Sequence, residues 1–273
     1  MKIFSDALEL KTYLKAITKS IGFVPTMGAL HDGHLSLIKA AKKECEFVVV
    51  SIFVNPTQFL EGEDLQKYPS NNEADKRVCT YAGVDVLFLP KAEDIYESDE
   101  ITLIAPPIRG YVLEGATRPG HFNGVLTVVN KLFNIVNPDY AYFGKKDAQQ
   151  LHLIALMVKQ LFMSVKIVPI DTVREIDGLA LSSRNIYLSK EEHKEALKIS
   201  RSLYEASNML RSGELEVQKI KEVMKKILEP LEIGYIEILN YEFKAIDEIE
   251  IGNTIILVEV IVGKTRLLDN IWL

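Results

Sequence analysis

The fold of this chain is decided by residues 21–54, which read IGFVPTMGALHDGHLSLIKAAKKECEFVVVSIFV. An apolar run at 21–24 leads into a glycine-rich turn, and residues 34–44 then mix apolar and basic side chains in a pattern that suits a helix. Residues 47–54 are almost continuously β-branched or aromatic, which is typical of a strand buried on both faces. The order strand, helix, strand predicts the first unit of a parallel sheet.

The same alternation continues to about residue 171. Helices are expected at residues 72–82, 124–136 and 147–162, and strands at 84–89, 140–143 and 165–170. Right-handed crossovers between such strands predict a doubly wound, Rossmann-like α/β domain.

The pattern changes after Asp171. Residues 190–211 and 214–228 are charged and amphipathic like surface helices, and residues 233–239 and 254–262 have the pattern of strands in a small antiparallel sheet. We therefore expect two domains, residues 1–171 and a smaller α+β domain over residues 172–273 that acts as a lid.

The composition excludes several classes of protein. With 48% hydrophobic residues the chain can build a sizeable core, and a net charge of -6 lacks the basic footprint of a nucleic-acid binder. Its two cysteines, Cys45 and Cys79, form no CxxC pair, so we expect small core residues rather than a disulfide or a zinc site. Acidic residues at Asp6 and Glu9 argue against a secretory signal, and no run of about 18 apolar residues predicts a membrane span. The expected location is the cytoplasm.

Residues 25–35 lie between the first strand and the first helix, where open α/β sheets bind phosphorylated ligands. The spacing of Gly28 and Gly33 fits a Walker loop, but His34 and Leu35 stand where that loop needs Lys and Ser or Thr, so we reject it. His31 and His34 can lie on one side of the first helical turn and donate hydrogen bonds to a phosphate. The alternatives are a zinc pair, for which no third ligand is near, and two incidental surface histidines.

Three further groups of polar residues are candidates for a binding site. Two of them follow predicted strands, and the third lies near the predicted domain junction. Asn55 and Gln58 place amides at the carboxyl edge of the sheet, where they suit a small hydroxy acid, although Asn-Pro turn chemistry would also explain them. Lys146 can hold a phosphate, while Asp147 either caps the next helix or meets a ribose. The run Ser182-Ser183-Arg184 is either a surface loop or a clamp on phosphate oxygens.

The histidine pattern resembles the HIGH signature of the class I nucleotidyltransferase superfamily. Four more segments resemble the pantothenate synthetase family in order and spacing: VNPTQF at 54–59, RPGHFNGV at 118–125, FGKKDAQQ at 143–150 and LSSRN at 181–185. Residues 262–270 are also similar to the end of that family, so the resemblance covers essentially the whole chain. There are two departures: Leu181 replaces the usual Met, and Lys145 replaces the usual Glu.

The resemblance implies an ATP-dependent ligase that joins pantoate to β-alanine through a pantoyl adenylate and releases AMP and pyrophosphate. Mg²⁺ is expected to arrive with ATP and to have no firm protein ligand. Glu73 and Asp75 are acidic residues that could touch it, but we expect them on a solvated helix face instead. A homodimer is also implied, with no nucleic-acid or membrane partner. The alternative is another small-molecule adenylyltransferase of the same superfamily.

The resemblance also assigns site residues by position. The catalytic set is His31, His34, Lys146, Ser182 and Arg184. The ATP-binding set is Pro25, Thr26, Met27, Gly28, His31, Gly33, His34, Arg118, Gly144, Lys146, Asp147, Val173, Leu181, Ser182, Ser183 and Arg184. The pantoate-binding set is Met27, Asn55, Gln58, Phe59, Phe143 and Gln150.

Overall fold

The computed structural model describes residues 1–63 and 65–273, which form two compact units. Unit 1 contains Met1–Lys145 and Gln149–Asp171, and unit 2 contains Lys146–Ala148 and Thr172–Leu273.

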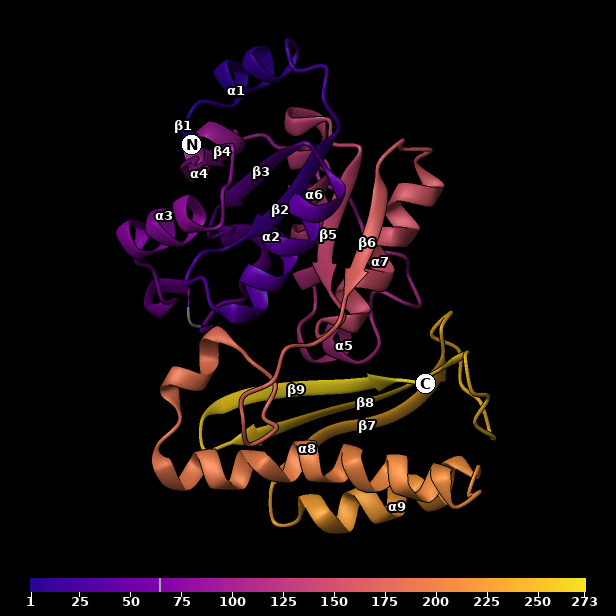
Figure 1. The fold of residues 1–273 in the computed structure, drawn as a ribbon. Coiled ribbons are helices and arrows are strands. Elements are labelled where there is room, and N and C mark those ends of the chain that lie inside the picture. The colour runs from indigo at the N-terminus through magenta and orange to yellow at the C-terminus, as the bar shows by residue number, and fades with distance from the viewer. Residues whose placement is uncertain (64) are drawn as a thin grey trace. The chain divides into compact units, whose positions relative to one another are not determined.

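Unit 1 is built on a six-stranded sheet in the order β1-β4-β3-β2-β5-β6 (Figure 1). Its strands are β1 (Lys2–Phe4), β2 (Ile21–Thr26), β3 (Phe47–Ile52), β4 (Val86–Phe88), β5 (Tyr140–Gly144) and β6 (Lys166–Ile170). All neighbouring strands pair in parallel, as predicted. The chain runs outward from β2 through β3 to β4 on one side and from β5 to β6 on the other. The point where the strand order reverses therefore lies between β2 and β5, and such a point is the usual ligand site of an open α/β sheet.

Helices cover both faces of this sheet, which explains why its central strands β2 and β3 are mostly apolar. On one face, Leu37 and Ile38 of α2 (Asp32–Glu44) pack in one core with Val24, Val48 and Val50. On the other face, Phe133 of α6 (His121–Val136) contacts Phe23 and Phe143 edge to face. The remaining helical elements around the sheet are α1 (Ala7–Leu14), η1 (Pro56–Gln58), η2 (Leu65–Lys67), α3 (Asn72–Tyr81), α4 (Ala92–Ile95), α5 (Glu114–Thr117) and α7 (Ala148–Gln160).

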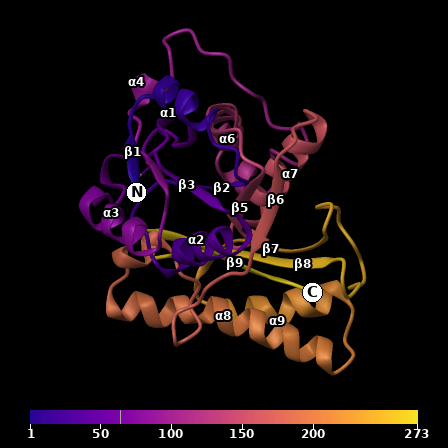
Figure 2. The same cartoon turned by 45° about the horizontal axis from the view of Figure 1, so that its top comes forward.

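Unit 2 is a three-stranded antiparallel sheet with two long helices on it (Figure 2). The strands are β7 (Glu232–Asn240), β8 (Thr254–Val262) and β9 (Thr265–Trp272), and the helical elements are η3 (Ser183–Tyr187), α8 (Lys190–Arg211) and α9 (Val217–Leu228). Ile199 and Leu203 of α8, with Ile220 and Met224 of α9, form one apolar core with the sheet. A capping box between Ser189 and Glu192 begins α8 at the predicted residue. The predicted fold class, a doubly wound α/β part followed by a smaller α+β part, is confirmed.

Several elements differ from the sequence prediction. Helix α6 starts at His121 rather than 124, and α9 starts at Val217 rather than 214. The sequence analysis did not predict β1, α1, α4, α5 or β9. Strand β9 was obscured because it carries buried Asp269 and Asn270, which interrupt the apolar pattern of a strand. Within residues 1–63 and 65–273, no helix combines the length and apolarity needed to cross a bilayer.

Candidate active site

The loop between β2 and α2 is held in shape by a carboxylate from another helix. Asp75 of α3 is 2% exposed, and it accepts hydrogen bonds from the main-chain nitrogens of Ala29 (3.0 Å) and Leu30 (2.8 Å). Ala29 has φ 51°, a strained conformation for a side chain with a Cβ, and these bonds help to hold it. The expected solvated face is therefore wrong for Asp75, whereas Glu73 is exposed and pairs with Lys76.

The two loop histidines stand side by side at the start of α2. His31 is the N-cap residue: its Nδ1 accepts from Gly33 N at 3.1 Å, and Nδ1 of His34 accepts from His31 N at 3.3 Å. The ring centroids lie 4.2 Å apart. A Cβ at position 33 would come within 2.8 Å of the His31 ring, so glycine is needed for this packing.

These contacts determine where each neutral histidine carries its proton. A nitrogen that accepts a hydrogen bond has no proton, so both rings are protonated on Nε2. Each Nε2–H is a donor of the kind that an anionic phosphate oxygen requires. The helix N-terminus adds a favourable dipole for the same anion.

Asn55 and Gln58 follow β3 and are joined to each other. Asn55, 1% exposed, donates from Nδ2 to Oε1 of Gln58 (3.1 Å) and to the carbonyl of Gly124 (3.2 Å). Its Oδ1 accepts from the hydroxyl groups of Tyr96 (2.7 Å) and Thr57 (3.0 Å). Asn55 thus orients the amide of Gln58, whose Nε2 faces Sδ of Met27 at 3.1 Å. The predicted contact of Asn55 with pantoate stays a prediction.

Arg118 makes contacts that the sequence analysis did not foresee. It is 7% exposed and pairs with Glu63, and it also contacts His121 and the carbonyl of Gln58. Its predicted contact with ATP stays a prediction. Glu63 and His121 were missed altogether, although His121 lies in the quoted RPGHFNGV segment.

Three more predicted residues of unit 1 lie at or just after the carboxyl end of β5. Phe143 is buried, Gly144 and Gln150 are partly exposed, and Lys145 pairs with Asp171 at 2.6 Å. Lys145, which stands where the family usually has Glu, thus gives Asp171 a cationic neighbour. The adjacent Gln149 is instead buried, and its amide nitrogen donates to the carbonyls of Arg109 and Val112.

In unit 2, main-chain contacts position the other predicted residues. The side-chain Nζ of Lys146 donates to Oδ1 of Asp147 at 3.5 Å. The main-chain carbonyl of Lys146 accepts from Nδ2 of Asn270 at 2.7 Å. Leu181 N donates to the carbonyl of Val173 at 3.0 Å. Ser182 caps η3, because its Oγ accepts from Arg184 N at 3.2 Å.

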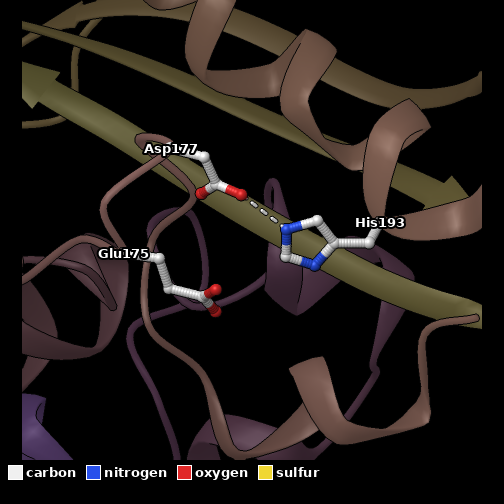
Figure 3. Close-up of side chains that lie close together, drawn as sticks. All are labelled: Glu175, Asp177 and His193. Atoms are coloured by element: carbon white, nitrogen blue, oxygen red, sulfur yellow. Dashed lines mark hydrogen bonds and ion pairs between the residues drawn. The ribbon is translucent and has the colours of Figure 1, made fainter. Parts of the chain in front are cut away.

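Glu175, Asp177 and His193 lie together beside this segment (Figure 3). Their ligand-type atoms lie within 4.8 Å of one another, which would allow a cation in principle. Glu175 accepts from Nδ2 of Asn185 at 2.8 Å, and Asp177 bonds to Nε2 of His193 at 2.7 Å. This hydrogen bond is the main cause that lowers the pKa of Asp177. The three groups therefore brace the segment from residue 175 to Asn185.

Within each unit, hydrogen bonds link some of the predicted site residues to one another. In unit 1 the loop at 25–34 and the amide of Gln58 meet through Met27, next to the point where the strand order reverses. In unit 2 the segment 173–185 is linked within itself, and Lys146 is linked to Asn270. The contacts of these residues with substrates stay predictions.

Comparisons with known proteins agree over the full length of the chain. Residues 2–272 match the family model described as pantoate-beta-alanine ligase. A pantothenate synthetase of Sulfurimonas denitrificans is 63% identical over 273 residues, which is 100% of both chains.

Two solved structures are also similar. A pantothenate synthetase from Thermus thermophilus matches with a TM-score of 0.95 and 41% identity over 99% of each chain. A pantoate-beta-alanine ligase from Francisella tularensis, complexed with β-γ ATP and β-alanine, matches with a TM-score of 0.82 and 37% identity, over 100% of this chain and 97% of that one. Sequence, fold and site geometry thus agree, and this chain belongs to the pantoate-beta-alanine ligase family.

Proposed function

We propose that the loop of residues 25–34 binds the phosphates of ATP and that the amides of Gln58 and Gln150 bind pantoate. The enzyme condenses pantoate with β-alanine at the expense of ATP and yields pantothenate, AMP and pyrophosphate. The observation that carries the proposal is the shared hydrogen-bond pattern of His31 and His34, which places the proton of both neutral rings on Nε2.

The proposed reaction consists of two nucleophilic displacements, the first at the α-phosphorus of ATP and the second at the acyl carbon of pantoate. A carboxylate oxygen of pantoate attacks the α-phosphorus of ATP, and the bond from that phosphorus to the bridging oxygen breaks to release pyrophosphate. The amine of β-alanine then attacks the acyl carbon, loses a proton and expels AMP. The protein forms no covalent bond, so it works by positioning the reactants and stabilising charge.

In unit 1, the proposed ATP contacts are made by the predicted residues Pro25 to Gly28, by Gly33 with the two histidines, and by Gly144. Nε2–H of His31 and of His34 would donate to the oxygens of the departing pyrophosphate, whose charge rises in the transition state. Asp75 supports this role because it fixes the main chain just before His31.

The proposed pantoate contacts use amides and apolar side chains. Gln58 can give its Nε2–H to a hydroxyl or carboxylate in place of the weak sulfur acceptor of Met27. Met27, Phe59 and Phe143 would form the apolar wall, and Gln150 the second amide. For Asn55 the observed contacts favour an indirect role through Gln58.

Family resemblance supports the proposed roles of the unit 2 residues. Lys146, Ser182, Ser183 and Arg184 would bind the triphosphate, Asp147 the ribose, and Val173 and Leu181 the rest of the nucleotide. We also propose that unit 2 acts as a lid. A guanidinium and an ammonium suit phosphate because both keep their charge at neutral pH.

Three further properties belong to the proposal. Mg²⁺ would enter with ATP as part of the substrate. A homodimer is supported by three apolar side chains of one segment of unit 1, Ile101, Ile104 and Ile108, which are 86%, 76% and 77% exposed. A cytoplasmic location is supported by the buried thiols of Cys45 and Cys79, which form no disulfide.

The experiment is to measure pyrophosphate release from Mg-ATP, with pantoate and β-alanine each left out in turn. Sustained release that needs both compounds, with AMP and pantothenate as products, is expected. Absence of release with pantoate, whether or not β-alanine is present, would contradict the proposed substrate. Release that needs pantoate but never β-alanine would favour another small-molecule adenylyltransferase.

A further inference from the structure

A buried ion pair between Arg118 and Glu63 contacts the main-chain carbonyl of Gln58. Arg118 and Glu63 form a two-pronged pair, with Nε to Oε1 and Nη2 to Oε2 both at 2.6 Å. Their side chains are 8% and 22% exposed, so the pair is shielded from water on most sides. Oε2 of Glu63 also accepts from Leu60 N at 3.0 Å. The segment that follows Gln58 is thereby fastened to the start of α6.

His121 extends this pair to the carbonyl of Gln58. Nη1 of Arg118 lies 3.0 Å from Nε2 of His121, and Nδ1 of His121 lies 2.7 Å from the Gln58 oxygen. Arginine can only donate, so Nε2 must be the acceptor and Nδ1 must carry the proton. The neutral Nδ1–H tautomer therefore donates to Gln58. Nη2 of Arg118 gives the same oxygen a second hydrogen bond at 3.2 Å.

Helix α6 also packs closely against the main chain next to Gln58. A Cβ at Gly124 would clash with the carbonyl oxygen of Thr57, so only glycine lets α6 approach η1 this closely. Asn55 then fixes the side chain, because its Nδ2 donates to Oε1 of Gln58. Main chain and side chain of one residue are thus oriented by separate sets of contacts.

We propose that Glu63, Arg118 and His121 are positioning residues for pantoate recognition, which act by fixing the main chain of Gln58 so that its amide points at the substrate. This inference rests on the proposed role of Gln58 in binding pantoate. It gives Arg118 a function that needs no contact with ATP. Arg118 already has a carboxylate, an imidazole and a carbonyl as acceptors, which are the partners that a buried guanidinium requires.

The test compares His121→Phe with His121→Asn. Phenylalanine keeps a ring but removes both nitrogens, whereas the amide of asparagine can place a donor near the position of Nδ1. His121→Phe is expected to raise KM for pantoate about tenfold, the size of one lost charge-assisted or buried hydrogen bond, and to change KM for ATP less than about twofold. His121→Asn should recover most of the loss. Asn134→Ala, an exposed substitution on the same helix as His121, serves as the matched control, and its KM values should not change.

A double-mutant cycle shows whether the effect passes through Gln58. In the Gln58→Ala background, His121→Phe should change KM for pantoate less than about twofold, because the side chain that it orients is gone. Independent, multiplicative losses would overturn the inference. A rise in KM for ATP instead of pantoate would also overturn it and would place Arg118 and His121 at the nucleotide.

The outcomes separate this inference from the proposed function. If Gln58→Ala leaves KM for pantoate unchanged in an active enzyme, the proposed role of Gln58 fails. If Gln58→Ala raises that KM but His121→Phe does not, only the positioning network fails. Circular dichroism checks that the variants fold. If His121→Phe does not fold, Glu63→Gln replaces it in the same cycle, with the same outcomes for and against.

Discussion

The carboxylate of Asp75 accepts a hydrogen bond from the main-chain nitrogen of Leu30 across 2.8 Å. These residues lie on α3 and on the loop before α2, and the bond joins positions 45 apart in the sequence. The same carboxylate holds Ala29. Helix α3 therefore sets the shape of the loop that ends in His31.

Removal of this carboxylate should cost both stability and turnover. Asp75→Ala leaves two N–H groups without their acceptor, so we expect a loss of about 2 kcal/mol in the free energy of unfolding, measured in urea. Turnover should fall because the histidines lose their support. Glu73→Ala removes an exposed carboxylate from the same helix and should leave the free energy of unfolding and the turnover as in wild type. Equal stability and activity of Asp75→Ala and wild type would show that the loop does not depend on Asp75.

His34→Ala should lower kcat about a hundredfold or more while the fold stays intact. Loss of one donor to a transition-state oxyanion typically costs about 3 kcal/mol of activation free energy. Steady-state pantothenate formation measures the effect, and circular dichroism checks the fold. Near-normal turnover in a folded His34→Ala enzyme would exclude His34 from phosphate stabilisation.

His31 has two separable roles, as a cap and as a donor. His31→Ala should lose both activity and about 1 kcal/mol of stability, the usual value of an N-cap. His31→Asn keeps an accepting oxygen at the cap, so stability should recover while turnover does not. If activity and stability recovered together, the Nε2–H of His31 would have no part in catalysis.

Gly124→Ala tests how close α6 must approach η1. The added Cβ would clash with the carbonyl oxygen of Thr57, so the two elements must move apart. We expect a loss of about 1–3 kcal/mol in stability, as in other overpacked sites, and a higher KM for pantoate. Asn134→Ala, an exposed substitution on the same helix, is the control and should change neither quantity. An unchanged KM for pantoate in Gly124→Ala would show that the position of η1 is not critical.

The cysteines should react slowly with alkylating reagents in the folded enzyme. Burial raises the pKa of the Cys79 thiol to about 12, and the nearby Asp75 adds to the shift. Because a raised pKa favours the neutral thiol, only about one molecule in ten thousand carries the reactive thiolate at pH 8. Iodoacetamide labelling, followed by mass spectrometry, should be fast in guanidinium and slow without it. Rapid labelling of Cys79 in enzyme with a native circular dichroism spectrum would contradict this environment.

Most of the parallel sheet could be predicted from the sequence because local patterns encode it. A strand such as Phe47–Ile52 is buried at every position, and five of its six residues are apolar, so its composition shows directly that both faces are covered. The His-x-x-His loop could also be located, since it lies between a clear strand and a clear helix. Strand β9 could not be predicted from local pattern. Its buried Asp269 is satisfied by Arg174, 95 residues away.

The residues that hold the site were harder to foresee for the same reason. Glu73 and Asp75 are alike in local sequence, and only the contact of Asp75 with a distant loop separates them. A guanidinium such as that of Arg118 binds a phosphate and a carboxylate with the same geometry. Its partner Glu63 lies 55 residues away, so the choice between the two depended on the tertiary structure.

The most direct test of the proposed chemistry is to follow an oxygen atom from pantoate. The enzyme would be given pantoate labelled with ¹⁸O in its carboxylate, together with Mg-ATP and β-alanine, and the products examined by mass spectrometry. Attack on the α-phosphorus leaves the attacking oxygen on phosphorus when the amine displaces AMP, so one labelled oxygen should appear in AMP. If ADP formed and the label appeared in inorganic phosphate, the carboxylate would have attacked the γ-phosphorus, and the adenylate mechanism would be wrong.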